Sequence, residues 1–436
     1  MLADRARNVA RQDLFPNTSV VGFYAPLSQT VCLPSWDSGM LDHAKGHPHF
    51  LSVAGDFFAT AAHELTHWLD HTATLWGQTL LVDIHRALGA FVEEDESQFW
   101  RIAALDSRMR REALASYYTK VDQPGQLGDA TTWSWQTSIG LEFGADGKPR
   151  PDRPIVFVRF NDRAHKRIAR VPLTIASLLE TSAMWAEQCI HFDVVATLPS
   201  EMKTDYASRF ITVQHRELYQ PELVLYSVAA HLVAGVCGTT DPSVAFALTA
   251  ALSSIVLNLP ATCLGALKVD AELRERFGER VDALIAIEDP GFVFLTLVRA
   301  APRVTDGLVI EEWVDAACRQ AGLPSTSEIA AEAHGAISAL ARDLPPGKLG
   351  ERAAELLALG RTNFETRGPC PPRPPSVVTV SDASEYTLPP IVLNDDRLLV
   401  FPSRTITNPL LAVEPSLDLA ERYSEWEQQF LAACRH

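Results

Sequence analysis

The stretch of sequence that decides the fold is Phe57-Phe-Ala-Thr-Ala-Ala-His-Glu-Leu-Thr-His-Trp-Leu-Asp-His71. Its spacing predicts an amphipathic helix from about Val53 to Leu75, because apolar residues recur every three or four positions on one arc. The opposite arc carries histidines, threonines and an aspartate. A solvated face usually carries Lys, Glu and Arg instead, so this composition favours a helix that lines a cavity.

Two of these histidines have the spacing of a metal-binding pair. His63 and His67 lie four residues apart, which places both rings on one side of a helix, within reach of one tetrahedral ion. Glu64 lies about 100° round the helix, where it can reach a water on the metal without binding the metal itself. The pattern predicts one zinc ion on His63 and His67, with Glu64 as general base. An ordinary amphipathic helix with surface histidines is the alternative.

Two further polar residues of this helix are expected beside the ligands or against a substrate. His71 lies about 12 Å along the helix axis from His63, at a rise of 1.5 Å per residue, so it cannot easily share the ion. Asp70 lies on the same polar arc. Both are predicted to support the site rather than to bind the metal.

The third metal ligand is predicted on the following helix, expected from about Thr79 to Ala104. Catalytic zinc typically takes three protein ligands and leaves the fourth position for water. On the helical wheel, Glu94 lies at the edge of the apolar arc and Asp95 lies within it. Because a buried carboxylate without a partner is costly, Glu94 is the predicted ligand and Asp95 the alternative.

Other candidate residues lie further along the chain. Glu180 and Glu187 lie seven residues apart on a predicted helix, with His191 four residues on, and could form a second metal site or complete the first. A polar stripe beside an apolar core is the simpler interpretation. Either hydroxyl of Tyr117 and Tyr118 could steady the oxyanion of a hydrolytic reaction, although half-buried tyrosines are often structural.

Composition limits the partners. The chain has 436 residues and a formal net charge of -16, which disfavours binding to nucleic acid or to an anionic membrane surface. Its 7 cysteines are scattered and never form a Cys-x-x-Cys pair, as expected for reduced thiols in a cytoplasmic protein. The start of the chain has no signal-peptide core, and the apolar run from Val244 to Leu257 is shorter than the roughly 20 residues of a membrane span.

Two stretches carry a resemblance to a known family. Residues 22–34, Gly-Phe-Tyr-Ala-Pro-Leu-Ser-Gln-Thr-Val-Cys-Leu-Pro, and residues 57–71 look like the metallopeptidase domain of ArdC-type antirestriction proteins. They resemble more distantly the ImmA/IrrE-type zinc peptidases, whose third ligand is a glutamate on the next helix. The resemblance covers about residues 15–105 and implies a gluzincin-like site with zinc on His63, His67 and Glu94. It also implies that the strand at residues 30–33 aligns an extended substrate.

The resemblance has limits. Leu69-Asp70 stands where the family usually has Thr-Gly, and no counterpart of the single-stranded DNA-binding module of ArdC is visible. We expect an α+β, mainly α-helical protein whose N-terminal zincin-like domain begins with a short β-hairpin and precedes a large helical region. The expected divisions are residues 1–121 for this domain, 122–170 for a loop-and-strand insertion, 171–367 for the helical region, and 368–436 for a Pro-rich linker with short strands and a C-terminal helix.

The function expected from these features is hydrolysis of a peptide bond in an intracellular protein or peptide substrate by zinc-activated water. Two other functions are compatible with the same residues. One is a zincin-like binding or regulatory scaffold with a structural metal. The other is a zinc hydrolase that acts on a non-peptide substrate, because the motif determines the metal chemistry better than the substrate.

Overall fold

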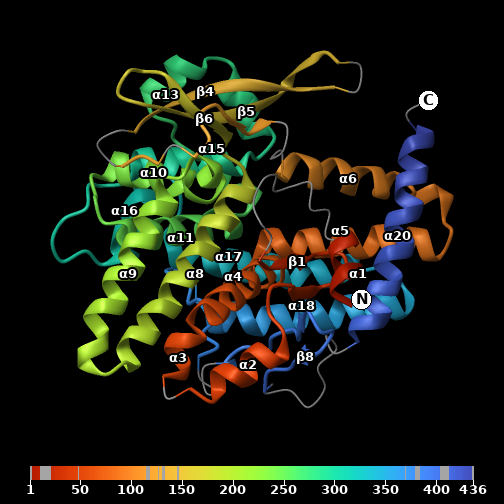
Figure 1. Cartoon of the computed structure of the whole chain (residues 1–436). Helices are drawn as coiled ribbons and strands as arrows, with labels where there is room; N and C mark the ends of the chain where they lie inside the picture. The colour runs from red at the N-terminus through yellow and green to blue at the C-terminus, as the bar shows by residue number, and fades with distance from the viewer. Residues whose placement is uncertain are drawn as a thin grey trace.

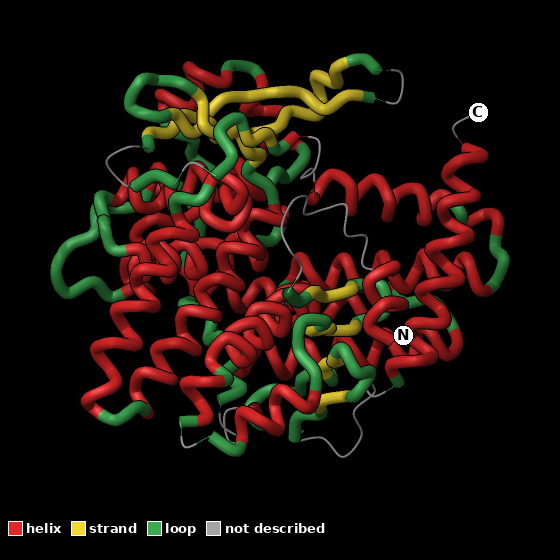
Figure 2. Tube along the Cα trace, viewed as in Figure 1, coloured by secondary structure: helices red, strands yellow, loops and turns green. Residues whose placement is uncertain are grey.

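The computed structural model describes residues 2–9, 21–47, 49–113, 118–125, 127–129, 133–144, 147–368, 370–378, 383–402 and 412–434. Most of these residues lie in helices, and the strands form two separate sheets of four strands each (Figure 1). Figure 2 shows one sheet at the top of the molecule and the other among the helices below. The predicted fold class, α+β and mainly helical, is confirmed.

The lower sheet joins the two ends of the chain. Its strand order is β1-β2-β7-β8, and the strands are β1 (Phe23–Ala25), β2 (Thr30–Leu33), β7 (Ile391–Leu393) and β8 (Leu398–Leu399). The predicted hairpin is confirmed, because β1 pairs antiparallel with β2. Since β2 also pairs with β7 on its other side, residues 30–33 cannot accept a further strand. The expected alignment of substrate along β2 is therefore wrong, and the edge strands of this sheet, among the described residues, are β1 and β8.

The upper sheet is antiparallel throughout, in the order β3-β6-β5-β4. Its strands are β3 (Lys120–Val121), β4 (Ser134–Phe143), β5 (Pro149–Asn161) and β6 (Arg167–Pro172). Val158 and Phe160 of β5 are fully buried and belong to the same core as Leu232 and Phe292 of the helices beneath. The sheet therefore covers one end of the helical region.

Most of the candidate site residues lie on two helices. The metal-binding motif lies in α4 (Gly55–Thr72), in which every residue except Asp56 and Thr60 is buried. Its apolar arc packs into a core, and its polar arc packs against α8 (Ile175–Thr197). Burial on both faces confirms that this helix does not present its histidines to open solvent.

Helix α8 connects two hydrophobic cores. Leu178, near the start of α8, lies in the core beneath the upper sheet. Ile190, about three turns further along the helix, lies in the core around α4 and the lower sheet. The second core contains residues from the beginning, middle and end of the chain, including Leu65, Leu356 and Ile391. Packing into both cores fixes how α8 lies against α4.

The turn after α4 sets the direction of α5 (Leu75–Val92). Thr74 caps α5, its hydroxyl accepting a hydrogen bond from the backbone N–H of Gly77 at 3.0 Å. A Cβ atom on Gly77 would lie 2.2 Å from the carbonyl oxygen of Asp70, so this close approach requires glycine. Helix α5 is followed by a short 3-10 helix, η2 (Glu96–Gln98), and by α6 (Trp100–Ala113).

The remaining helices complete the two cores. Near the lower sheet lie α1 (Leu2–Val9), α2 (Ser38–Lys45), α3 (Phe50–Val53), α17 (Thr326–Leu340), α18 (Gly347–Arg367) and α20 (Val413–Cys434). The others are α9 (Ser200–Leu218), α10 (Val224–Cys237), α11 (Pro242–Asn258), α12 (Ala261–Leu264), α13 (Ala271–Phe277), α14 (Arg280–Ala286), α15 (Pro290–Ala300) and α16 (Ile310–Gln320), with the 3-10 turns η3 (Pro221–Leu223) and η4 (Ala341–Asp343). Helix α20 packs against α1, so the first and last described helices are neighbours (Figure 1).

In the described part of the chain, no single helix combines the length and hydropathy of a membrane span. The segments 200–218 and 221–237 meet those limits only when taken together, and they are bent by 76° at the break between them.

Candidate metal centre

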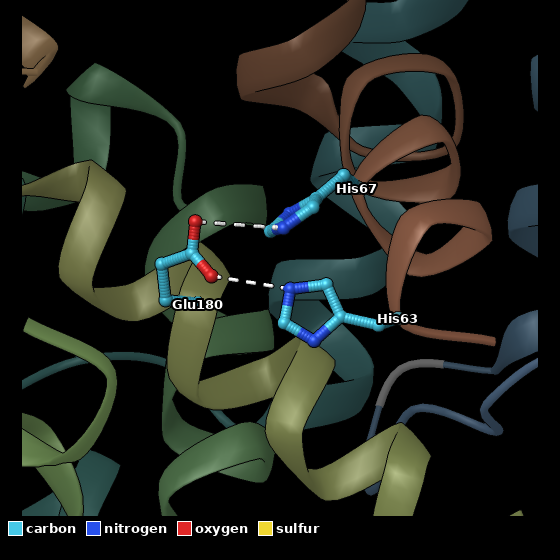
Figure 3. A group of neighbouring side chains, drawn as sticks. All are labelled: His63, His67 and Glu180. Atoms are coloured by element: carbon cyan, nitrogen blue, oxygen red, sulfur yellow. Dashed lines mark hydrogen bonds and ion pairs between the residues drawn. The ribbon is translucent and has the colours of Figure 1, made fainter. Parts of the chain in front are cut away.

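His63 and His67 lie on successive turns of α4 and face α8 (Figure 3). Their ring centroids are 4.8 Å apart and the rings meet edge to face. Both side chains are buried, with about a tenth of their surface exposed. The spacing of the motif therefore has the predicted effect, and two imidazole rings converge on one point at the wall of a cavity.

Glu180 of α8 supplies a third candidate ligand. Its Oε2 lies 3.2 Å from Nε2 of His63, and its Oε1 lies 3.6 Å from Nε2 of His67 (Figure 3). One ligand atom from each of the three side chains lies within 4.8 Å of the others. Tetrahedral bonds of about 2.0–2.2 Å separate ligand atoms by about 3.3–3.6 Å, which matches the distances from Glu180 to the two histidines, so the three side chains could hold one ion. Glu180 was expected only as one of several possible contributors.

The electrostatics of the three side chains favour a cation between them. Burial alone would raise the pKa of Glu180, but the charges and hydrogen bonds of His67 and His63 outweigh it and lower the pKa to about 2. Burial alone would lower the pKa of His63, but Glu187 and Glu180 raise it well above its usual value. Each shift shows that positive charge is stabilised at this position, whether a proton or a metal ion carries it.

Glu187, two turns after Glu180 on α8, orients the first histidine. Its Oε1 lies 2.5 Å from Nδ1 of His63. With a proton on Nδ1, Nε2 of His63 presents its lone pair toward Glu180. A carboxylate that holds the outer nitrogen of a metal-binding histidine is a common support of such sites. Glu187 was expected, together with Glu180, to form a second metal site or to complete the first, and the structure brings it to His63.

Glu64 faces the same cavity but is not one of the three converging side chains. It is buried, and burial raises the pKa of its carboxyl from 4.5 to about 7. A Cβ atom on Gly22 would lie 2.9 Å from both Cγ and Oε1 of Glu64, so the strand that leads into β1 runs directly over this carboxyl. The predicted place of Glu64, beside the ligands rather than among them, agrees with this arrangement.

The prediction of Glu94 as third ligand, with Asp95 as alternative, is wrong. The expected continuous helix from 79 to 104 breaks instead, because α5 ends at Val92 and α6 begins only at Trp100. Glu94 and Asp95 therefore lie in an exposed turn, where Asp95 caps η2 by accepting a hydrogen bond from the N–H of Ser97. The eighteen residues of α5, at 1.5 Å per residue, also place this turn about 27 Å along the helix from the end of α4.

His71 packs against His67, the second candidate ligand. Its Nδ1–H donates a hydrogen bond to the carbonyl oxygen of His67 at 2.8 Å, and its ring lies 4.9 Å from the rings of both Tyr24 and Trp76. Burial lowers the pKa of His71 to about 3, so this ring is neutral. His71 lines the cavity next to His67 without joining the three converging side chains.

Asp70 points away from the cavity. Its Oδ1 lies 2.6 Å from Nη1 of Arg367, the last residue of α18, and both side chains are buried. Burial raises the pKa of Asp70, while Arg367 opposes the shift. Asp70 is not among the residues that line the cavity, so the expected role in substrate contact is wrong, and the residue instead ties α4 to α18.

Neither tyrosine candidate is shown at the site. The ring of Tyr118 packs on Phe157 of the upper sheet, and its hydroxyl lies 3.5 Å from the N–H of Phe143. Tyr118 is absent from the cavity wall, and Tyr117 lies outside the described residues. The tyrosine beside the metal centre is Tyr226 of α10, whose ring centroid lies 6.3 Å from that of His63. The position of Tyr226 results from tertiary packing, and no local sequence pattern predicts it.

The cavity above these residues has a volume of about 840 Å³. Its wall is formed by the approach to β1, by α4, and by the facing sides of α8, α9 and α10. The three converging side chains thus have protein on one side and an open space large enough for several residues of an extended chain on the other.

No family model matches the chain, and no curated protein or solved structure shows significant similarity to it. The function proposed below therefore rests on the residues of the metal centre and its cavity.

Proposed function

We propose that this chain is a metallopeptidase of the zincin class, with one zinc ion held by His63, His67 and Glu180. The observation that carries the proposal is the convergence of these three side chains at a cavity wall, with the carboxyl of Glu64 beside them. Two imidazoles and one carboxylate are a ligand set of catalytic zinc, which keeps its fourth position for water or substrate.

In the proposed mechanism the metal ion and the side chains have different roles. Zinc bound at such a site acts as a Lewis acid toward the scissile carbonyl and makes water acidic enough to attack at neutral pH. Glu64 accepts the proton of the attacking water and delivers it to the leaving amine. His63 is held in the required orientation by Glu187, and the side chains of Glu64 and Glu180 are themselves buried at the cavity wall.

The cavity fits an extended peptide better than a compact small molecule. Val21, Gly22 and the first residues of β1 line it, and β1 is an edge strand of the described lower sheet. An extended chain can pair with such an edge through backbone hydrogen bonds. The proposal of a peptide substrate therefore rests on the edge strand β1 as well as on the volume of the cavity.

A purely structural metal is less compatible with these features. Structural zinc sites usually have four protein ligands, whereas three side chains converge here and Glu187 is engaged by Nδ1 of His63. A buried carboxyl next to the ligands also has no use in a structural site. A zinc hydrolase acting on a non-peptide substrate keeps the same metal chemistry and is separated from the peptidase by its substrates.

The test uses zinc-loaded wild-type protein and Glu64→Gln, incubated with a denatured protein mixture, with products mapped by mass spectrometry. We expect new peptide termini from the wild type, their loss with a chelator and their return with zinc. Glu64→Gln should bind zinc normally and produce none. Glu93→Gln, in the exposed turn after α5, is the matched control. Cleavage by Glu64→Gln, or cleavage insensitive to the chelator, would contradict the proposal.

A further inference from the structure

The cavity beside the metal centre is lined by carboxylates, and no lysine or arginine is among the described residues of its wall. Glu64, Glu180 and Glu187 already have roles at the metal centre. Glu112 accepts hydrogen bonds from Arg108 and Trp76, so its charge is balanced locally. Further from the metal, the wall still carries unbalanced negative charge.

Part of that charge lies where α4, α8 and α9 meet, and Glu222 of η3, which accepts a hydrogen bond from the N–H of Gly125, also lines the cavity. Glu217 of α9, Asp56 of α4 and Glu187 of α8 all line the cavity. Burial, followed by the charges of Glu187 and Asp56, raises the pKa of Glu217 to about 7, and exposed Arg216 only partly offsets these effects. Carboxylates that repel one another in this way favour a cation between them.

Helices α8 and α9 form an antiparallel pair that brings further groups to the same place (Figure 1). Near the turn between them, the ring of His191 lies 4.5 Å from that of Phe210, and its Nδ1 lies 2.9 Å from the hydroxyl of Tyr206. One turn back along α8 from His191 are Glu187 and Gln188, and one turn on along α9 from Phe210 are Val213 and Gln214. All of these residues except Tyr206 line the cavity.

Two glutamines provide an independent sign of a ligand. Gln188 is 2% exposed and Gln214 is 5% exposed. Both amide atoms of Gln188, Nε2 and Oε1, and the Nε2 of Gln214 are buried without a hydrogen-bond partner. Buried polar atoms are rarely left unpaired in proteins. Both side chains line the cavity, where a bound peptide can satisfy them. A cationic side chain can donate to Oε1 of Gln188, and backbone carbonyls of the same peptide can accept from the two Nε2 groups, because ammonium and guanidinium groups have no acceptor.

The chemistry of the subsite selects one class of group. Carboxylates and the amide oxygen of Gln188 accept hydrogen bonds from N–H donors, which ammonium and guanidinium groups supply. Phe210, Val213 and the neutral face of His191 give an apolar wall for an alkyl stem. An acidic side chain would be repelled by the carboxylates of Glu217, Asp56 and Glu187.

We propose that Glu217, Asp56, Gln188 and Gln214 form a subsite for a lysine or arginine side chain of the substrate. The peptide nature of that substrate rests on the proposed function. The subsite makes the enzyme selective for basic sequences, with the charged head between α8 and α9 and the backbone of the same residue extending toward the metal centre.

Binding to an inactive form tests this inference apart from turnover. Zinc-loaded Glu64→Gln is titrated calorimetrically with N-acetylated, C-amidated alanine-leucine octapeptides that carry one arginine, or citrulline in its place. We expect the arginine peptides to bind about ten- to a hundredfold more tightly, as for hydrogen bonds to a charged group. Adding Glu217→Gln should remove most of this preference, and Asp56→Asn, at the exposed rim, should reduce it.

Glu201→Gln, an equal change of charge at an exposed position of α9 outside the cavity, is the control and should keep the preference. Equal affinity for arginine and citrulline peptides, absence of binding by the arginine peptides, or an equal effect of Glu201→Gln would overturn the subsite. Tighter binding of peptides with a free amino terminus, regardless of arginine, would assign the charge to a terminal ammonium and also overturn it.

The same peptides separate the two proposals. If the wild type cleaves arginine and citrulline peptides equally well, the proposed subsite is contradicted and the proposed peptidase activity is supported. If arginine peptides bind more tightly than citrulline peptides but no peptide or protein is cleaved, the subsite is supported and the peptidase activity is contradicted.

Discussion

Oε1 of Glu187 lies 2.5 Å from Nδ1 of His63, on the side of the ring opposite Glu180. This contact fixes the tautomer and the rotation of the imidazole. Glu187→Ala should therefore lower zinc affinity about ten- to a hundredfold, the usual cost of losing such a support. Glu187→Gln, which retains an acceptor, should cost less. Competition with a chromophoric chelator measures both, and unchanged affinity in Glu187→Ala would show that the contact has no role in metal binding.

Gly22 determines the room available to Glu64. A Cβ atom there would lie 2.9 Å from Oε1 of Glu64 and 2.8 Å from Cδ2 of Leu33, so Gly22→Ala must displace the carboxyl or the strand. A misplaced base costs about a hundredfold in rate while metal binding persists. We expect kcat to fall by roughly that factor with one zinc still bound. Gly265→Ala, where the added Cβ meets open space, is the control. Normal kcat in Gly22→Ala would argue against Glu64 as base.

The buried pair of Asp70 and Arg367 should act on stability and not on metal binding. Removing one partner leaves an uncompensated buried charge, so Arg367→Met should lower the free energy of unfolding by about 3–5 kcal/mol. The double variant Asp70→Leu, Arg367→Met should be closer to the wild type than Arg367→Met alone. Denaturant titration measures both, with zinc content as the second readout. A double variant less stable than either single one would show that the pair is not the cause.

His85 and His231 should make the fold sensitive to mild acid. Burial lowers the pKa of each to about 4, against about 6.5 in an unfolded chain. Between these values the unfolded state binds more protons, so stability is complete above pH 6.5 and is lost as the pH falls toward 4. Between pH 7 and 5 each should cost about 2 kcal/mol. His85→Leu should flatten the measured dependence, and the same change at exposed His43 should not. An equal slope in His85→Leu would contradict this.

The helix of the metal-binding motif was predictable because its evidence is local. The spacing of His63, Glu64 and His67 and the apolar arc opposite them belong to one helix, and no distant residue is needed to interpret them. The hairpin of β1 and β2 is local in the same way. Its edge was misassigned because β7, the second neighbour of β2, comes from the far end of the chain.

The third candidate ligand, Glu180, was not predictable on the same basis. Glu94 was chosen from a helical wheel that assumed an unbroken helix, and the break after Val92 invalidates that wheel. Glu180 reaches His63 only because α8 packs along α4, which is a property of the tertiary structure. The sequence did carry a signal, since Glu180 and Glu187 share one face of an apolar helix, but it did not indicate which helix they face.

The most direct test of the metal centre compares zinc content in three purified proteins: the wild type, Glu180→Ala and Glu94→Ala. The zinc content of each protein is measured by elemental mass spectrometry after dialysis, and circular dichroism confirms that each is folded. We predict one zinc ion per chain in the wild type and in Glu94→Ala, and its loss from folded Glu180→Ala. Zinc retained by Glu180→Ala and lost from Glu94→Ala would contradict the assignment of His63, His67 and Glu180 as the ligands.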